Sequence, residues 1–537
     1  MPTLRKPAVG LAIALLLVGL LSFSLARPGF TWMNAYSPNK ETRSFNRDDD
    51  RFVRAARDFG NARIYLQGYP PFMTTQLFVI GTAASSLGIK GPINPVTLRV
   101  LSFAWALAML VLTAALARWY GLSAFAAGVS AYLLAVAPQF ALLASQGTAD
   151  ISALVLFYAS ILSAMLARTR RSRWWFYASW VLAGVAMADK FFLPALVAPA
   201  LLVFAAPRGR RLEAAFIGSA LGLASFCAAS LFNYTPWDFR RLMTMLMYDN
   251  LIIDGGRNRL QQVIAYSGDL FVTAGIFTTL VAIAAVVDWA IRKRDCLQRL
   301  PGAVPRDGRG FVMAAVSFAK HPTALLALPL LLNLALILNA QVHFARHVLV
   351  YAPVICLLAA SLVDRVMDRL RHRSAPMRVA SFLGGIVLAA LLFANAYAVT
   401  SHYADDIRVQ VANRIAREPG VAVTATNFYT AIRGTRQIDQ PVPSSERYLT
   451  CDIEFARYLG KTNVHQVFHP YGGQARLNFL NDLFAGQTAY RPILTVERKP
   501  RSLEEHAASA GLLPELDTKF PDKCILFERA DVAARVS

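Results

Sequence analysis

Apolar segments long enough to cross a lipid bilayer recur along this chain, and they constrain its fold more than any other feature. A helix needs about 20 predominantly apolar residues to span a hydrocarbon core of about 30 Å. Only 16% of the residues are charged. We therefore expect an α-helical polytopic membrane protein with about 11 transmembrane helices, at residues 8–26, 97–117, 122–142, 149–167, 174–188, 191–206, 213–232, 269–291, 321–340, 346–363 and 378–399.

Clusters of basic residues between the apolar segments predict the orientation, because Lys and Arg are retained in cytoplasmic loops. The four clusters, at 168–173, 208–211, 292–299 and 368–378, share one side, and this is the side of the N-terminus only if residues 72–88 do not span the membrane. That segment has 17 residues and follows two prolines, so we expect a re-entrant or interfacial helix. The N-terminus is then cytoplasmic, with 8–26 as an uncleaved anchor, and the C-terminus is exported.

The basic residues also bear on the class of partner. Lys and Arg give the chain a net charge of +22, but they form no single patch with interleaved aromatic residues. Nucleic-acid binding is therefore excluded, and membrane lipids are the expected neighbours. We expect residues 233–254 to lie at the interface as an amphipathic helix, with a lid over a lipid substrate as the alternative.

The composition changes near residue 400, where the apolar segments end. Residues 401–537 are predicted to form an exported α/β domain, with strands within 421–432 and 462–470 and helices opening at 444–460 and 502–512. Cys451 and Cys524 lie in this region, and in an exported domain they could pair. No cysteine or histidine spacing typical of a metal site occurs, so no metal site is expected.

The predicted topology gathers acids and bases at the exported membrane surface. Residues 48–50, "DDD", fall in the exported loop 27–96, and Asp150 lies at the exported end of 149–167. Lys190 and Arg346 lie at the same level in two further segments. Charges at the edge of apolar helices are costly unless they have partners or a function.

Each charge also has a structural explanation. Asp150 would suit the first turn of its helix, Lys190 would suit the headgroup region, and Arg346 would suit anionic lipid. His343 and His347 read as interfacial side chains. A function explains the charges together, because a sugar on a lipid phosphate needs cations at its phosphate and an incoming hydroxyl needs a carboxylate base.

Four segments carry a family resemblance. "DDDRFVRAA" followed by "YPPF", then "QGTADISALVLFY", "ADKFFLPALVAP" and "RHVLVYAPVICLLAA", occur in this order. They resemble the segments of GT-C glycosyltransferases, and the protein O-mannosyltransferase and aminoarabinose-transferase group is the most similar. The resemblance covers about residues 8 to 400 and implies a transmembrane catalytic domain at 1–400, with the exported domain at 401–537.

The resemblance also implies roles for individual residues. The acid pair of the family lies three and four residues before an aromatic residue, which here is Phe52, so it falls on Asp49 and Asp48. Asp48 is the implied base, with Asp50 as a third candidate that leaves the register open by one residue. Asp150 belongs to the catalytic set, and Lys190 and Arg346 are implied to bind the donor phosphate.

The implied reaction is a single, inverting displacement that moves a sugar from a polyprenyl-phosphate donor to an acceptor on the exported face. The acceptor is a glycan, a lipid or a protein, no cofactor is expected, and the location is a bacterial inner membrane with a periplasmic C-terminal domain. Two alternatives stay open. A transporter or flippase of lipid-linked sugars is expected to carry polar residues near the bilayer midplane, and a scaffold for the C-terminal domain would not need Asp48.

Overall fold

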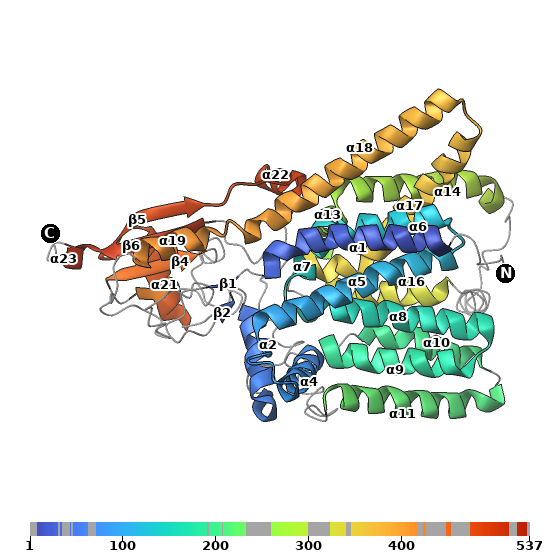
Figure 1. Cartoon of the computed structure of the whole chain (residues 1–537), viewed down its shortest axis with the longest axis horizontal. Helices are drawn as coiled ribbons and strands as arrows, with labels where there is room; N and C mark the ends of the chain where they lie inside the picture. The colour runs from blue at the N-terminus through green and yellow to red at the C-terminus, as the bar shows by residue number, and fades with distance from the viewer. Residues whose placement is uncertain are drawn as a thin grey trace.

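Long helices lying side by side dominate the structure, a computed structural model of the whole chain (Figure 1). The structure describes residues 8–30, 33–34, 43–44, 47–62, 71–190, 193–206, 208–231, 259–298, 323–339, 345–416, 423–425, 447–452, 473–514 and 523–533. The helical array forms one part, and a smaller domain with a β-sheet lies at one end of it.

Each predicted span overlaps a described helix or a pair of helices. Six of them are long and apolar enough to cross a membrane, or eight if each of two bent pairs is one span. The polytopic α-helical fold is confirmed, and the number of 11 crossings stays a prediction. The helices of the array are α1 (Ala8–Phe30), α5 (Pro95–Trp119), α6 (Ala124–Ala135), α7 (Pro138–Ala144), α8 (Ala149–Arg170), α9 (Arg173–Lys190), α10 (Val197–Ala205), α11 (Arg211–Ala229), α13 (Arg259–Ala274), α14 (Ile276–Gln298), α16 (Ala324–Asn339), α17 (Ala352–Arg371) and α18 (Ala375–Thr400).

Two predicted spans are not straight helices. The span expected at 122–142 consists of α6 and α7, which meet at an angle of 71°. Pro138 opens α7, and a proline inside a continuous helix would remove a hydrogen bond and clash with the preceding turn. The span expected at 269–291 begins within α13, which is bent by 112° from α14. Gly275 occupies this bend with a φ of +89°, a conformation that side chains with a Cβ rarely adopt.

The segment predicted not to span the membrane is helix α4 (Phe72–Ser86), of 15 residues. It packs against α2 (Arg47–Arg57) and against α5, α8 and α9. A short antiparallel pair, β1 (Met33–Asn34) and β2 (Arg43–Ser44), precedes α2, and the 3₁₀ helix η1 (Phe59–Asn61) follows it. Helices α2 and α4 lie beyond one end of the array, on the side of the β-sheet domain (Figure 1). We call this the α2 end of the bundle.

Small residues bring two helices of the array into close contact. A Cβ atom on Gly184 of α9 would lie 2.1 Å from the carbonyl oxygen of Gly222 in α11. A Cβ on Gly218, one turn earlier in α11, would lie 2.4 Å from the ring of Trp180. Glycines four residues apart allow this approach of two apolar helices, which the hydrophobic effect alone does not drive in a membrane.

The C-terminal domain is built on a four-stranded sheet with the order β3-β4-β6-β5. Its strands are β3 (Val423–Ala425), β4 (Tyr448–Asp452), β5 (Tyr490–Glu497) and β6 (Lys523–Arg529), and only β3 and β4 are parallel among the described pairs. Helix α19 (Ile407–Ala416) packs on one face and α21 (Gly473–Phe484) on the other. The described part of this region contains both strands and helices, and β3 falls within the range 421–432 in which a strand was expected; the bounds and the exported location of the domain stay predictions.

One predicted helix of this domain is wrong. Residues 448–452 form the central strand β4 instead of a helix opening. Tyr448 and Leu449 are both fully buried on opposite faces of the sheet, under α19 and α21, and this burial on two faces outweighs the capping signal in the sequence. The register pairs Asp452 with Cys524 and Cys451 with Ile525. The Cys451 side chain and residues 462–470 lie outside the described residues.

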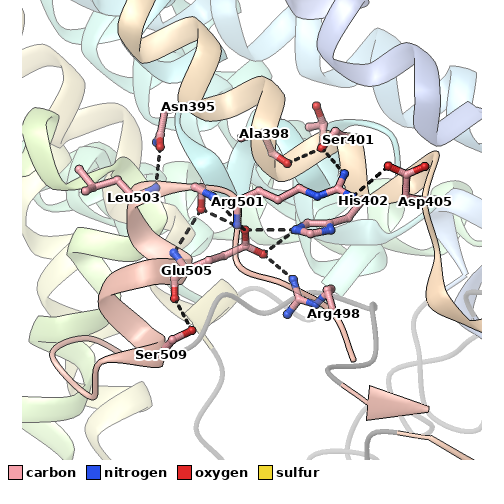
Figure 2. Close-up of polar contacts among 12 residues, drawn as sticks. Asn395, Ala398, Ser401, His402, Asp405, Arg498, Arg501, Leu503, Glu505 and Ser509 are labelled. Carbon is pink, nitrogen blue, oxygen red and sulfur yellow. Dashed lines mark hydrogen bonds and ion pairs between the residues drawn. The ribbon is translucent and has the colours of Figure 1, made fainter. Parts of the chain in front are cut away.

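Helix α22 (Leu503–Ser509) joins the C-terminal domain to the bundle (Figure 2). It was predicted from the sequence, and Ser502 and Glu505 form a capping box at its start. Glu505 also binds His402, which follows α18, at 2.9 Å. Glu504 accepts hydrogen bonds from the Asn395 side chain at 2.7 Å and from the first N–H of α14 at 3.2 Å. These polar contacts fix the domain at the α2 end.

Candidate functional site

Helix α2 is seated on the beginning of α8 through a small hydrophobic cluster. Phe52 and Val53 of α2 are buried there with Met73 of α4, Leu98 of α5 and Ala149. Ala149 immediately precedes Asp150. The cluster therefore brings the acidic turn of α2 to the end of α8 at which Asp150 lies, although 98 residues separate Asp49 from Gly147 along the chain.

Asp49 is fully buried in an ion pair with Arg99. The Arg99 Nε atom donates to the Asp49 carboxylate at 2.7 Å, and neither side chain is exposed. Arg99 also donates to the carbonyl of Gly29 at 2.9 Å, and the N–H of Gly147 donates to Asp49 at 3.1 Å. A Cβ on Gly147 would lie 2.5 Å from Leu98, so only glycine lets this N–H reach the carboxylate. The ion pair ties together α2, α5, the end of α1 and the loop before α8.

Positions 48 and 50 lie on different sides of helix α2. About 100° separates neighbouring residues of a helix, so positions i, i+4 and i+7 share a side. Position 48 therefore lies with Phe52 and Ala55, which are buried against the bundle. Position 50 lies with Arg54 and Arg57, which are exposed. The side chains of residues 48 and 50 themselves lie outside the described part of the chain.

Asp150, Lys190 and Arg346 come together at the same end of the bundle. Lys190, the last residue of α9, donates a hydrogen bond to the Asp150 carboxylate at the start of α8. The Asp150 side chain is 8% exposed, whereas that of Lys190 is 29% exposed. Arg346 lies on the 3₁₀ helix η4 (Ala345–Tyr351) and interacts electrostatically with Asp150. One buried carboxylate thus faces two cations from two other elements.

Two further residues belong to this group, and sequence reasoning did not assign either to it. The fully buried carboxylate of Asp189 lies beside Ser152 and the backbone of Met73, within electrostatic range of Asp150 and Lys190. Thr148, two residues before Asp150, is buried at the same helix start. A carboxylate next to Lys190 in the sequence was the available signal for Asp189. No signal in the sequence pointed to Arg99, the partner of Asp49, because a single arginine in an apolar span has the pattern of an interfacial residue.

Several predicted features stay untested by the described geometry. His343 and residues 233–254 lie outside the described residues. Within the described part of the chain, no three His, Cys, Asp or Glu side chains gather closely enough to hold a metal ion. The structure unites Asp49, Asp150, Lys190 and Arg346 with α2 at one end of the bundle, and their catalytic and phosphate-binding roles stay predictions.

Comparisons with known proteins agree with the resemblance seen in the sequence. Residues 84–232 match the sequence model of the dolichyl-phosphate-mannose-protein mannosyltransferase family. No curated protein sequence matches the chain significantly. Among solved structures, the apo oligosaccharyltransferase of Archaeoglobus fulgidus superposes with a TM-score of 0.50 at 13% identity, covering 97% of this chain and 88% of that chain.

ArnT from Cupriavidus metallidurans is a second structural neighbour. Its apo structure gives a TM-score of 0.47 at 14% identity and covers 98% of this chain and 99% of that chain. Its structure with undecaprenyl phosphate gives 0.42 at 15% identity, with 76% and 73% covered. At such identities a structural likeness concerns the fold alone. Residues 84–232 are thus similar to the dolichyl-phosphate-mannose-protein mannosyltransferase family, and the fold of the chain resembles that of the oligosaccharyltransferase.

Proposed function

We propose that the chain transfers a sugar from a polyprenyl-phosphate donor to an acceptor on the exported face of a bacterial inner membrane. The family matched at residues 84–232 is named for a sugar carried on a polyprenyl-type phosphate, which supports this class of donor. Residues 1–400 would form the catalytic domain, with the loop 27–96 at the exported face. The C-terminal domain, 401–537, would be periplasmic because it lies at the α2 end (Figure 1).

The proposed chemistry is one displacement at the anomeric carbon. Asp48 takes the proton of the acceptor hydroxyl, and the oxygen attacks the anomeric carbon as the bond to the phosphate oxygen breaks. The electron pair leaves with the polyprenyl phosphate. A single displacement inverts the anomeric configuration. Lys190 and Arg346 neutralise the charge that develops on the phosphate.

The observation that carries this proposal is the convergence of Lys190 and Arg346 on Asp150, next to the acidic turn of α2. The Asp150 carboxylate binds Lys190 and lies within electrostatic range of Arg346, and Lys190 remains partly exposed to meet a ligand. In this arrangement Asp150 orients the cations. Asp49, which is committed to Arg99, positions α2, so that Asp48 is left as the base.

A sugar-transfer assay in proteoliposomes tests the proposal. Asp48→Asn should abolish transfer of radiolabelled sugar from the polyprenyl-phosphate donor without changing expression. Lys190→Met should weaken donor binding at least tenfold, within the range for charge-assisted contacts. Lys190→Arg should recover only part of it, because a planar guanidinium places its donors differently. Asp58→Asn and Lys90→Met are matched controls at the same end of the bundle and should leave transfer unchanged.

The assay also separates the transferase from a transporter or flippase. A flippase would move the labelled donor between leaflets of the proteoliposome and form no glycosylated product. Wild-type protein that moves the donor without product formation would refute the proposed reaction. Full transfer by Asp48→Asn would remove Asp48 as the base.

A further inference from the structure

The 3₁₀ helix that carries Arg346 needs support from outside. Helix η4 has seven residues, whereas 3₁₀ helices rarely exceed three or four because their hydrogen bonds are poorly aligned. Its residues Val348, Leu349 and Val350 are buried. Whatever holds η4 in place therefore also sets the position of the Arg346 backbone.

The end of η4 has a carbonyl that its own helix cannot satisfy. In a 3₁₀ helix each carbonyl accepts from the N–H three residues later. For Val350 that residue is Pro353, which has no N–H. The Tyr158 hydroxyl donates to the Val350 carbonyl at 2.5 Å instead, and Tyr158 is fully buried. A buried carbonyl without a donor is costly, so this bond anchors η4 to α8.

We propose that Tyr158 is a positioning residue of the donor site, and this inference rests on the proposed phosphate-binding role of Arg346. Asp150 lies eight residues before Tyr158 on α8, about 12 Å along the helix axis at 1.5 Å per residue. Arg346 lies four residues before Val350, about 8 Å along η4 at 2.0 Å per residue. The Tyr158 bond therefore fixes η4 against α8, and this sets the position of Arg346 relative to Asp150.

Two hydrogen bonds of the Tyr351 hydroxyl hold η4 from another side, but they do not set the distance between Asp150 and Arg346. The Tyr351 hydroxyl donates to the carbonyl of Leu330 at 3.0 Å and accepts from the Asn333 side chain at 3.2 Å. Both partners lie on α16, which carries none of the proposed site residues. Only the Tyr158 bond joins η4 directly to the helix of Asp150 among the hydrogen bonds described here.

The competing explanation is that the Tyr158 bond stabilises the fold and nothing else. Tyr132 provides a matched control, because its hydroxyl donates to the carbonyl of Ala389 and joins α6 to α18. None of the proposed site residues lies on these two helices. Tyr132→Phe and Tyr158→Phe each remove one hydroxyl and keep the ring, so both should lower the thermal midpoint to a similar degree.

Binding of undecaprenyl phosphate to the purified full-length protein in detergent is the decisive measurement. We expect Tyr158→Phe to weaken binding by roughly three- to tenfold, the effect of about one hydrogen bond, while Tyr132→Phe leaves it unchanged. In an Arg346→Met background, Tyr158→Phe should have no further effect, because the group that it positions is gone. Pro353→Ala in the Tyr158→Phe protein should restore binding, because residue 353 then offers an N–H to Val350.

The results separate this inference from the proposed function. Unchanged binding in Tyr158→Phe while Arg346→Met binds weakly would overturn the inference alone. Unchanged binding in Arg346→Met would overturn both. Effects of the two substitutions that simply add would also contradict positioning through Arg346. If Tyr158→Phe does not fold, the Tyr158→Phe/Pro353→Ala protein is measured in its place, and weak binding there would reject the rescue that the geometry requires.

Discussion

Loss of the Asp49 charge should damage the stability of the protein more than its chemistry. Asp49 and Arg99 are both fully buried and joined at 2.7 Å. Asp49→Asn keeps the size of the side chain but removes the negative charge that pairs with Arg99 at 2.7 Å. Breaking a buried ion pair by neutralising one partner typically costs about 3–5 kcal/mol.

The magnitude follows from the number of segments that the pair joins. Asp49 binds α5 through Arg99 and the loop before α8 through Gly147, and Arg99 continues to Gly29 at the end of α1. A cost of about 3 kcal/mol should lower the thermal midpoint in detergent by several degrees. Transfer activity, measured per folded molecule well below that midpoint, should persist in Asp49→Asn and be lost in Asp48→Asn.

A paired replacement provides the control. Asp49→Leu with Arg99→Met removes both charges and fills the site with apolar groups of similar volume, which often recovers the stability of a buried ion pair. The midpoint of the double variant should exceed that of Asp49→Asn. An unchanged midpoint with complete loss of transfer in Asp49→Asn would refute the reasoning and identify Asp49 as the base.

Three further predictions concern the remaining structure. Burial acts to raise the pKa of Glu505, but the hydrogen bond and charge of its histidine partner outweigh it and lower the pKa from 4.5 to about 2. The ionised Glu505 therefore contributes roughly 3 kcal/mol to the free energy of unfolding above pH 4.5, and this contribution is lost as the pH falls towards 2. Acid unfolding of Glu505→Gln should accordingly show a shallower pH dependence than that of the wild type. Gly184→Leu should lower the thermal midpoint by separating α9 from α11, whereas Gly384→Ala, at an exposed position with open space, should not. A cysteine at position 92 in a cysteine-free protein should react with an impermeant reagent from the exported side and one at position 172 from the cytoplasm, and the reverse pattern would invert the topology.

The sequence was most informative where one physical property acts alone. The length of the apolar segments predicted the helices of the array, because an α-helix satisfies the backbone hydrogen bonds of such a segment within a bilayer. The short, hydroxyl-rich segment at 72–88 forms the 15-residue helix α4 beside α2, and its place outside the spans stays a prediction. Pro138 itself indicated the break between α6 and α7, because proline interrupts a helix. The prediction of one continuous span at 122–142 overlooked this signal.

Contacts between distant segments could not be read in the same way. Arg99 lies 50 residues from Asp49, and a lone arginine near the end of an apolar segment has the same sequence pattern whether it faces lipid or a buried acid. The strand β4 was missed for a related reason. Its burial on both faces depends on α19 and α21, which lie on either side of it in the chain, and neither is visible from the five residues themselves.

The choice among three consecutive aspartates shows how packing decides a role that spacing leaves open. Measured from Phe52, the spacing admits Asp48 and Asp49 as the acid pair and leaves Asp50 as a neighbour. In the folded helix the three positions differ by about 100° each, and their surroundings differ accordingly. Position 49 faces Arg99 in the interior, and position 50 lies with the exposed Arg54 and Arg57. Asp49 is thus held by a structural counter-charge, and for this reason Asp48 is the proposed base, which the two Asp→Asn variants test.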